Sequence, residues 1–464
     1  MQGRTHIIKM ACFSFLLCLI LGSNALWAQE GARKHVVEAL DNYYSISLKY
    51  DVSIEELKQA NPGIAIPKKG DVLVIPQKGQ FIEASVSTDC ARLRKNRHEI
   101  YRVALMIPFY LEQVADTLWA DNLDPTKIND LIPFRFTRFY HGFMLAADSL
   151  RKEGLNLEIY VYDVDHLTSK ALNVIHKPEL KKMDLIFGPF FKSSFSIVAD
   201  FAKENKIPVI NPLSARSDIL QGNPFVYKLL PTIESQPALL AGLISRDFND
   251  HRIIFYVANP YHDNELIANY IQAIEQNDKT GKQKVILVDY SADSIQGFHD
   301  HASLIQPNLV IIYSENEVLP AALLSKLSAL KNDYQISVIG LPEWEKFGNI
   351  ESGYLLTLNA HVFQSSFTDY NSDNVKGFIQ SYRSKYMDEP VDYALTGFDA
   401  GFFFLSALLN YGNDFERCID EQRIQLIQNQ YHFKRIEDGG YDNVYWNILQ
   451  YEDYRLVNRS VSWK

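Results

Sequence analysis

Residues 35–76 constrain the fold of this chain most, because short strand and helix signals follow one another there without a gap. The run His35–Val37 predicts a strand. Asp41 or Asn42 is suited to cap a helix that continues to Tyr50. This first half of the segment therefore predicts one strand followed by one helix.

The second half of the segment predicts the same two elements in reverse order. Ser53 and Glu56 have the spacing of a capping box, in which each side chain bonds the backbone amide of the other residue. Pro62 and Gly63 end that helix, and Val72–Ile75 predicts a second strand. The result is a small βααβ unit, only marginally able to bury a core.

These motifs resemble the LysM module, a unit that binds N-acetylglucosamine glycans such as peptidoglycan. The resemblance covers residues 35–77 and places the glycan in a shallow groove between the loop after the first strand and the loop after the second helix. One departure affects that groove, because the family usually has glycine where this chain has Leu40. The positions that the resemblance assigns to glycan binding are Leu40, Asp41, Asn42, Asn61, Pro62, Gly63 and Ile64.

The first residues of the chain predict export. Arg4 and Lys9 precede an apolar run from Met10 to Leu21, and the small or polar residues Gly22–Ala25 and then Ala28 follow. Basic, apolar and then small residues are typical of a secretory signal peptide, here residues 1–28. The apolar run is shorter than the roughly 20 residues that span a bilayer. We expect a periplasmic or cell-envelope protein with no integral membrane segment in the mature chain.

The net charge argues against one class of partner, and the cysteines leave two arrangements open. The formal net charge is −10, which argues against a nucleic-acid partner. Beyond the signal peptide the cysteines are Cys90 and Cys418, and in an oxidising compartment they either form a disulfide or remain two buried thiols. Residues 78–100 predict a linker, and its basic cluster Arg92–His98 is interpreted as a solvated connector.

From Tyr101 onward, strand and helix signals alternate. Such alternation indicates parallel sheets covered by helices on both faces. The expected strands of a first series are Val103–Ile107, Leu157–Tyr162, Asp184–Phe187 and Pro208–Ile210. Those of a second series are Ile253–Val257, Val285–Val288, Leu309–Tyr313 and Ile336–Gly340. The stretch from residue 101 to residue 464 is too long for one open sheet with one core. We therefore expect an α/β domain with two lobes and doubly wound sheets.

Residues 101–464 resemble the type I periplasmic binding protein fold, most clearly in Asp184–Pro189 and Ile207–Ser214. In that family the chain crosses between the lobes three times. We expect crossings near Phe225–Leu230, near Tyr354–Asn359 and within Tyr431–Ile448. Lobe 1 would then hold about 101–228 and 355–415, and lobe 2 about 232–350 and 416–464.

Doubly wound sheets bind ligands at the carboxyl ends of their strands, so the loops there predict an interlobe ligand site. Ser214 matches a position that holds amino-acid ligands in relatives, whereas Phe190 and Phe191 stand where a small hydroxylated residue is usual. This departure argues against an amino-acid ligand. The residues assigned to the cleft are Tyr110, Phe190, Ser193, Ser214, Asp263, Ser314 and Trp344.

The sequence gives little support for catalysis. It contains no nucleophile elbow, zinc-protease, phosphate-loop or dinucleotide-binding motif. Asp163 and Asp165 are interpreted either as an acid–base pair or, more usually, as a hydrogen-bonded turn. His141 and His361 lack metal-ligand spacing. We expect a protein that is not an enzyme and uses no cofactor and no metal.

Two hypotheses for function follow. In the first, a non-catalytic envelope protein binds peptidoglycan through its LysM module and a small solute, peptide or muropeptide in the cleft. In the alternative, the two-lobed domain is a ligand-free scaffold or regulator that contacts a cell-wall synthase or another envelope protein.

Overall fold

The structure, a computed structural model, describes most of the chain beyond the N-terminal segment. The described residues are 33–37, 41, 43–50, 52, 57–58, 60–64, 67–75, 90, 99–112, 114, 132–258, 264–278, 284–391, 393–422 and 424–460. The expected signal peptide, the capping box of Ser53 and Glu56 and the basic cluster Arg92–His98 lie outside them. The chain falls into two compact units, one with residues 1–83 and 371–377 and one with the rest.

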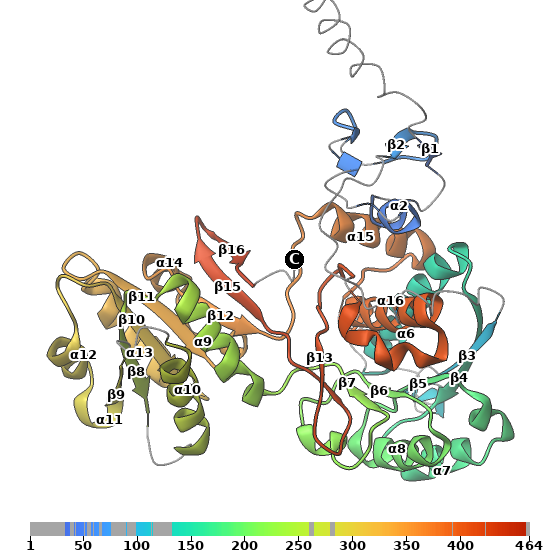
Figure 1. The fold of residues 1–464 in the computed structure, drawn as a ribbon, viewed down its shortest axis with the longest axis horizontal. Helices are drawn as coiled ribbons and strands as arrows, with labels where there is room; N and C mark the ends of the chain where they lie inside the picture. The colour runs from blue at the N-terminus through green and yellow to red at the C-terminus, as the bar shows by residue number, and fades with distance from the viewer. Residues whose placement is uncertain are drawn as a thin grey trace, which may run out of the picture. The chain divides into compact units, whose positions relative to one another are not determined.

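The N-terminal module has two strands and a helix in its described part (Figure 1). Strand β1 (Arg33–Val36) pairs with β2 (Val72–Ile75) in antiparallel fashion, with His35 opposite Leu73. Helix α2 (Tyr43–Tyr50) follows β1, as the capping signals predict. The buried apolar residues of the module are Val37, Tyr43, Ile46, Val52, Leu57, Leu73 and Ile75.

The first lobe is built on a seven-stranded sheet with the order β13-β14-β7-β6-β5-β3-β4. Every neighbouring pair is parallel except β13 and β14. Its strands are β3 (Ile100–Ile107), β4 (Asn156–Asp163), β5 (Leu185–Phe187), β6 (Val209–Asn211), β7 (Val226–Lys228), β13 (Phe433–Arg435) and β14 (Tyr441–Asn443). Its helices are α6 (Ile132–Lys152), α7 (Thr168–Ile175), α8 (Lys192–Asn205), α15 (Asp373–Tyr386) and α16 (Ala394–Tyr411), with short helical turns η2 (Pro178–Lys182), η3 (Ser217–Leu220), η6 (Gly412–Arg417) and η7 (Ile419–Glu421).

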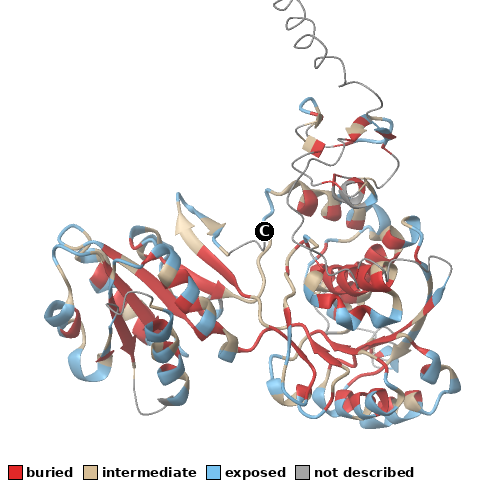
Figure 2. Ribbon diagram, viewed as in Figure 1, coloured by how far each residue is buried: buried red, intermediate tan, exposed pale blue. Residues whose placement is uncertain are grey.

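Helices α6 and α16 pack against each other unusually closely. A Cβ atom on Gly142 would lie 1.9 Å from the Ala394 carbonyl oxygen, and one on Gly397 would lie 2.1 Å from that of Phe139. Glycine at both positions therefore lets the two backbones touch. Almost all of α16 is buried as a result, which Figure 2 shows as a red helix beside α6.

The second lobe is built on another seven-stranded sheet, with the order β16-β15-β12-β11-β10-β8-β9. Its strands are β8 (Arg252–Val257), β9 (Val285–Asp289), β10 (Asn308–Tyr313), β11 (Ile336–Leu341), β12 (His361–Gln364), β15 (Asn447–Glu452) and β16 (Arg455–Asn458). Its helices are α9 (Gln236–Asp247), α10 (Asn264–Asn277), α11 (Tyr290–Asp293), α12 (Gln296–His301), α13 (Val318–Ala329) and α14 (Ser352–Thr357), with short turns η4 (Ile233–Ser235) and η5 (Trp344–Lys346). Strands β8 to β12 run parallel, whereas β15 and β16 are antiparallel to their neighbours.

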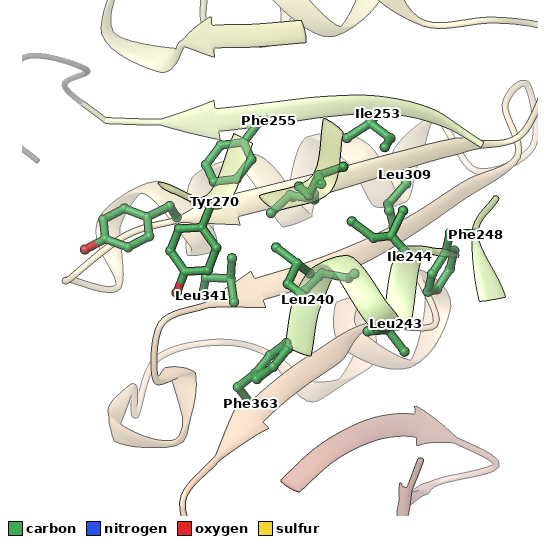
Figure 3. Packing of buried hydrophobic residues seen from close by; sticks show 14 of the residues in the cluster. Leu240, Leu243, Ile244, Phe248, Ile253, Phe255, Tyr270, Leu309, Leu341 and Phe363 are labelled. Atoms are coloured by element: carbon green, nitrogen blue, oxygen red, sulfur yellow. The ribbon is translucent and has the colours of Figure 1, made fainter. Parts of the chain in front are cut away.

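One face of the second sheet packs on α9 and α10 through a continuous apolar cluster (Figure 3). Leu240 and Ile244 of α9 meet Leu309 of β10, and Tyr270 of α10 lies near Phe255 of β8. The opposite face is covered by a second cluster that includes residues of α13 and α14. Both faces are thus apolar, which explains the continuous apolar strands seen in the sequence. The mixed α/β architecture expected from the alternation is confirmed.

The chain passes between the two sheets at three places. It leaves the first sheet after β7, returns after β12, and leaves again between β14 and β15. The crossing expected near Tyr354–Asn359 is wrong, because α14 and β12 still belong to the second lobe and residues 365–372 make the connection. The assignment of residues 416–443 to lobe 2 is also wrong. Strand β14 pairs with β7, so the β13–β14 hairpin completes the first sheet.

The two cysteines form a disulfide, which resolves the choice left open by the sequence. The Cys90–Cys418 bond joins the residue just upstream of β3 to the chain between η6 and η7, across 328 residues. The expected linker therefore has a covalent attachment to the large unit at Cys90.

Candidate functional site

The first loop of the expected glycan groove is held by a buried histidine. His35 is only 4% exposed, and its Nε2 atom lies 2.8 Å from the Asp41 carboxylate. Its Nδ1 atom lies 3.0 Å from the Tyr50 hydroxyl, and the two rings meet edge to face. Asp41 is therefore tied to β1 and to the end of α2. Leu40 and Asn42 lie outside the described residues.

The second groove loop is held by Asn61 and Tyr43. The Asn61 side-chain amide donates to the carbonyls of Leu57 and Val74 and accepts from the Val74 amide, at 2.7–2.8 Å. The Tyr43 hydroxyl donates to the Ile64 carbonyl at 2.5 Å. Both side chains are buried, so these bonds are screened little by water.

The exposed part of the second loop is the turn at Pro62 and Gly63, while Ile64 is half-buried. A side chain built on Gly63 would meet no atom within 4 Å, so this position is open. Of the expected glycan residues, Asp41 and Asn61 use their side chains inside the module. Among the described groove positions, the exposed turn at Pro62 and Gly63 and the half-buried Ile64 are the surfaces that a sugar can contact. Sequence reasoning missed His35 and Tyr43, although both stand in predicted elements.

In the large unit, the carboxyl ends of β3 and β4 are joined by a charged cluster. The Asp163 carboxylate accepts hydrogen bonds from the amides of Tyr110 and Leu111. Lys170 of α7 lies 3.1 Å from Asp163 and 2.9 Å from Asp165. Burial raises the pKa of Asp165, but the Leu167 amide and the Lys170 ammonium outweigh it and hold that pKa below its usual value. The hydrogen-bonded turn is therefore the interpretation that these contacts fit.

Three rings, those of the buried Tyr110, the half-buried Phe191 and the exposed His166, lie beside this cluster. Tyr110, His166 and Phe191 form a triangle of rings with centroids 6.0–6.4 Å apart. His166 is exposed and Phe191 is half-buried. The Ser193 hydroxyl, in the first turn of α8, donates to the His166 carbonyl. The structure thus brings Tyr110 and Ser193 together, and it adds His166, which follows a predicted strand by the same rule that selected them.

The carboxyl end of β6 carries a second charged group. Ser214 accepts from the Arg216 amide, and its own amide donates to the Asn211 side chain. Arg216 and Lys192 both lie 2.8 Å from the Asp218 carboxylate. Hydrogen bonds from Arg216 and Lys192 hold the pKa of Asp218 far below its usual range. Both cations remain mostly exposed.

Three expected cleft residues are instead parts of the core. Phe190 is 6% exposed and packs against Phe136 and Phe139. Trp344 lies on Gly340 and donates its indole N–H to the Leu341 carbonyl. The buried Ser314 hydroxyl donates to the Asn316 carbonyl. These side chains cannot serve as ligand contacts without leaving those partners. Asp263 lies outside the described residues.

The two histidines considered as metal ligands have other surroundings. His141 stacks on Tyr386 at 4.0 Å, and His361 is buried against Phe248. Burial lowers the pKa of both imidazoles, that of His361 to about 4. Within the described part of the chain, no group of three His, Cys, Asp or Glu side chains is placed to hold a metal ion.

Comparison with known proteins agrees with both parts of the fold. Residues 35–76 match the LysM domain family. No curated protein is significantly similar to the chain in sequence.

Among the described helices, none combines the length and apolar character needed to cross a bilayer.

Solved structures that resemble the chain include an ABC transporter protein and a periplasmic ligand-binding protein. One, named for a branched-chain amino acid ABC transporter from Rhodospirillum rubrum, has a TM-score of 0.53 at 14% identity and covers 77% of this chain and 99% of its own. LpoA from Haemophilus influenzae has a TM-score of 0.48 at 13% identity, with 78% of this chain and 59% of its own covered. A periplasmic ligand-binding protein from Burkholderia xenovorans has a TM-score of 0.46 at 10% identity, with 77% and 94% covered.

At these identities the likeness concerns the fold alone. Of the three, only the structure from Rhodospirillum rubrum, with a TM-score of 0.53, is similar enough to support the fold. It agrees with the two parallel-dominated sheets and their helical layers. The chain therefore combines an N-terminal LysM domain at residues 35–76 with a two-lobed domain of the type I periplasmic binding protein fold.

Proposed function

We propose that this protein is a non-catalytic component of the bacterial cell envelope that holds peptidoglycan through its LysM domain and a small solute or peptide through its two-lobed domain. The observation that carries the first half is the LysM match over residues 35–76. The expected export signal places such a protein in the periplasm, where peptidoglycan is available.

The groove geometry supports glycan binding through the backbone. Pro62 and Gly63 are exposed on a turn whose flanking residues are fixed by buried hydrogen bonds. A loop that is already ordered loses little entropy on binding. Exposed peptide groups are able to pair with the acetamido groups of N-acetylglucosamine, which present one donor and one acceptor each.

Glycan binding is tested by sedimenting the full mature chain with purified peptidoglycan sacculi. Gly63→Glu adds a charged side chain where the structure has open space, so we expect binding to fall at least tenfold with an unchanged melting temperature. Gly348→Glu is the matched control, since Gly348 is equally open but lies in the second lobe. A wild-type chain that stays in solution contradicts the proposal.

The proposed solute site is the carboxyl edge of the first sheet. His166, Phe191 and Ser193 lie together there, and Lys192 and Arg216 are exposed near the following strand. An aromatic surface bordered by hydrogen-bonding and charged groups is a common composition for small-ligand sites. Lys170 forms ion pairs with both Asp163 and Asp165 in the same place, which supports binding rather than acid–base chemistry.

A thermal-shift screen of amino acids, peptides and muropeptides tests the solute proposal, because a ligand specific for the native state raises the melting temperature. We expect a shift that His166→Ala reduces and that His301→Ala, an exposed histidine elsewhere, leaves unchanged.

The scaffold function remains the second candidate, and one observation favours it. Ser314 and Trp344, at the strand ends of the second lobe, have their polar atoms engaged internally. Absence of a shift with every compound would favour this alternative.

A further inference from the structure

We propose that His35 and Tyr43 are positioning residues of the glycan groove, His35 by holding Asp41 on one side and Tyr43 by holding Ile64 on the other. This inference rests on the proposed glycan binding and adds the residues that prepare the site for it. Neither side chain is expected to touch the glycan, since both are almost fully buried.

Asp41, the described residue of the first groove loop, is held through a short chain of side-chain contacts. Tyr50, at the end of α2, bonds the Nδ1 atom of His35, and the Nε2 atom bonds the Asp41 carboxylate. The imidazole therefore links β1, Asp41 and the far end of α2. This contact assigns the Asp41 carboxylate to positioning.

The second loop is fixed from the start of the same helix. The Tyr43 hydroxyl bonds the Ile64 carbonyl, just after the exposed turn. On the other side of that turn, the Ile64 amide donates to the Asn61 carbonyl, and the Asn61 side chain is bonded to β2. The turn at Pro62 and Gly63 is thus held at both ends.

Loss of either set of contacts is expected to weaken glycan binding. Helix α2 carries Tyr43 at its first residue and Tyr50 at its last, so one helix bonds Ile64 directly and Asp41 through His35. Without one of these bonds, the residue that it holds is less ordered in the free protein. Glycan binding must then order that residue, and the lost conformational entropy weakens the affinity. A buried hydrogen bond contributes enough for an expected loss of affinity of about three- to tenfold.

The test measures binding of tetra-N-acetylchitotetraose to the full mature chain by calorimetry, well below the melting temperature. Tyr43→Phe removes only the hydroxyl, and His35→Leu removes both ring nitrogens. His35→Gln keeps an N–H donor that can reach Asp41, so we expect it to restore most of the affinity lost in His35→Leu. Tyr270→Phe is the matched control, because it removes a buried hydroxyl that bonds Gln236 in the second lobe.

The outcomes separate the inference from the proposed function. Weaker binding by Tyr43→Phe and His35→Leu, with partial rescue by His35→Gln and no change in Tyr270→Phe, supports positioning. Full affinity in both variants with only a lower melting temperature shows that these residues stabilise the fold and overturns the inference. Failure of the wild-type chain to bind overturns the proposed glycan binding itself, and this inference with it.

Discussion

The LysM module and the two-lobed domain differ in how far apolar burial stabilises them. In the module, the described apolar core is small, and three buried polar side chains (His35, Tyr43 and Asn61) connect its strands, helix and loops. In the large domain, apolar clusters cover both faces of the second sheet, and two helices touch through glycine. A small unit gains less from apolar burial, so single hydrogen bonds determine more of its shape.

The large domain also contains one polar anchor of the same kind. Asp399, in the middle of α16, is fully buried and accepts hydrogen bonds from the amides of Ile427, Gln428 and Asn429. The comparison therefore predicts that polar deletions matter in both units, but that each affects only its own unit. Calorimetry of the full chain, with one transition for each unit, is the measurement that tests this.

The largest effect is expected from Asp399→Ala. It leaves three buried amides without an acceptor, and each buried donor left unpaired costs about 1–3 kcal/mol. The transition of the large unit should fall sharply while that of the module stays in place. Asp399→Asn keeps one acceptor oxygen and should cost less. Equal losses for the two variants would show that the amides find other partners.

Removal of the disulfide is expected to cost about 2–4 kcal/mol, the range usual for bonds that restrict the unfolded chain. The double variant Cys90→Ser and Cys418→Ser should lower the transition of the large unit in denaturant melts. The LysM transition should not move. If it does, the two units do not unfold independently.

Acidification is expected to destabilise the large unit through His361, whose pKa is about 4 in the folded chain against 6.5 for an ordinary imidazole. Its Nδ1 atom has no hydrogen-bond partner among the described residues. The unfolded state takes up the proton first, so stability should fall as the pH drops from about 6.5 toward 4, by up to about 3 kcal/mol. His361→Leu should flatten this part of the pH profile.

The smallest absolute effect, about 2 kcal/mol, is expected from Asn61→Ala in the module. The substitution leaves the Val74 amide and two carbonyls without their partner. In a unit with so small a core, that loss should lower the LysM transition visibly and leave the large unit unchanged. An unchanged LysM transition would show that apolar packing, and not these bonds, holds the module.

Local pattern was sufficient to predict most elements but not how distant ones pair. The buried strands at Val103–Ile107 and Leu309–Tyr313 were evident because parallel strands covered on both faces are continuously apolar. The hairpin of β13 and β14 was missed, since its pairing with β7 joins residues more than two hundred positions apart. The assignment of residues 416–443 to lobe 2 was wrong for the same reason.

Burial also divides the candidate site residues into accessible and enclosed ones, a division that the sequence did not predict. Phe190 and Trp344 stand at the ends of strands, where ligand contacts are expected, but neighbouring aromatic rings and backbone atoms enclose them. His166 stands at an equivalent end and remains exposed. Position along a strand selects an edge of the sheet, and only the packing around it decides which side chains stay accessible.

By itself, the sequence determined the identity of the LysM module and the α/β alternation, because these depend on motifs and periodicities contained within short segments. The tertiary structure decided the disulfide, the contact of α6 with α16 and the engagement of His35 with Asp41. Each of these depends on distances between groups that local pattern does not encode, and on whether water is excluded around them.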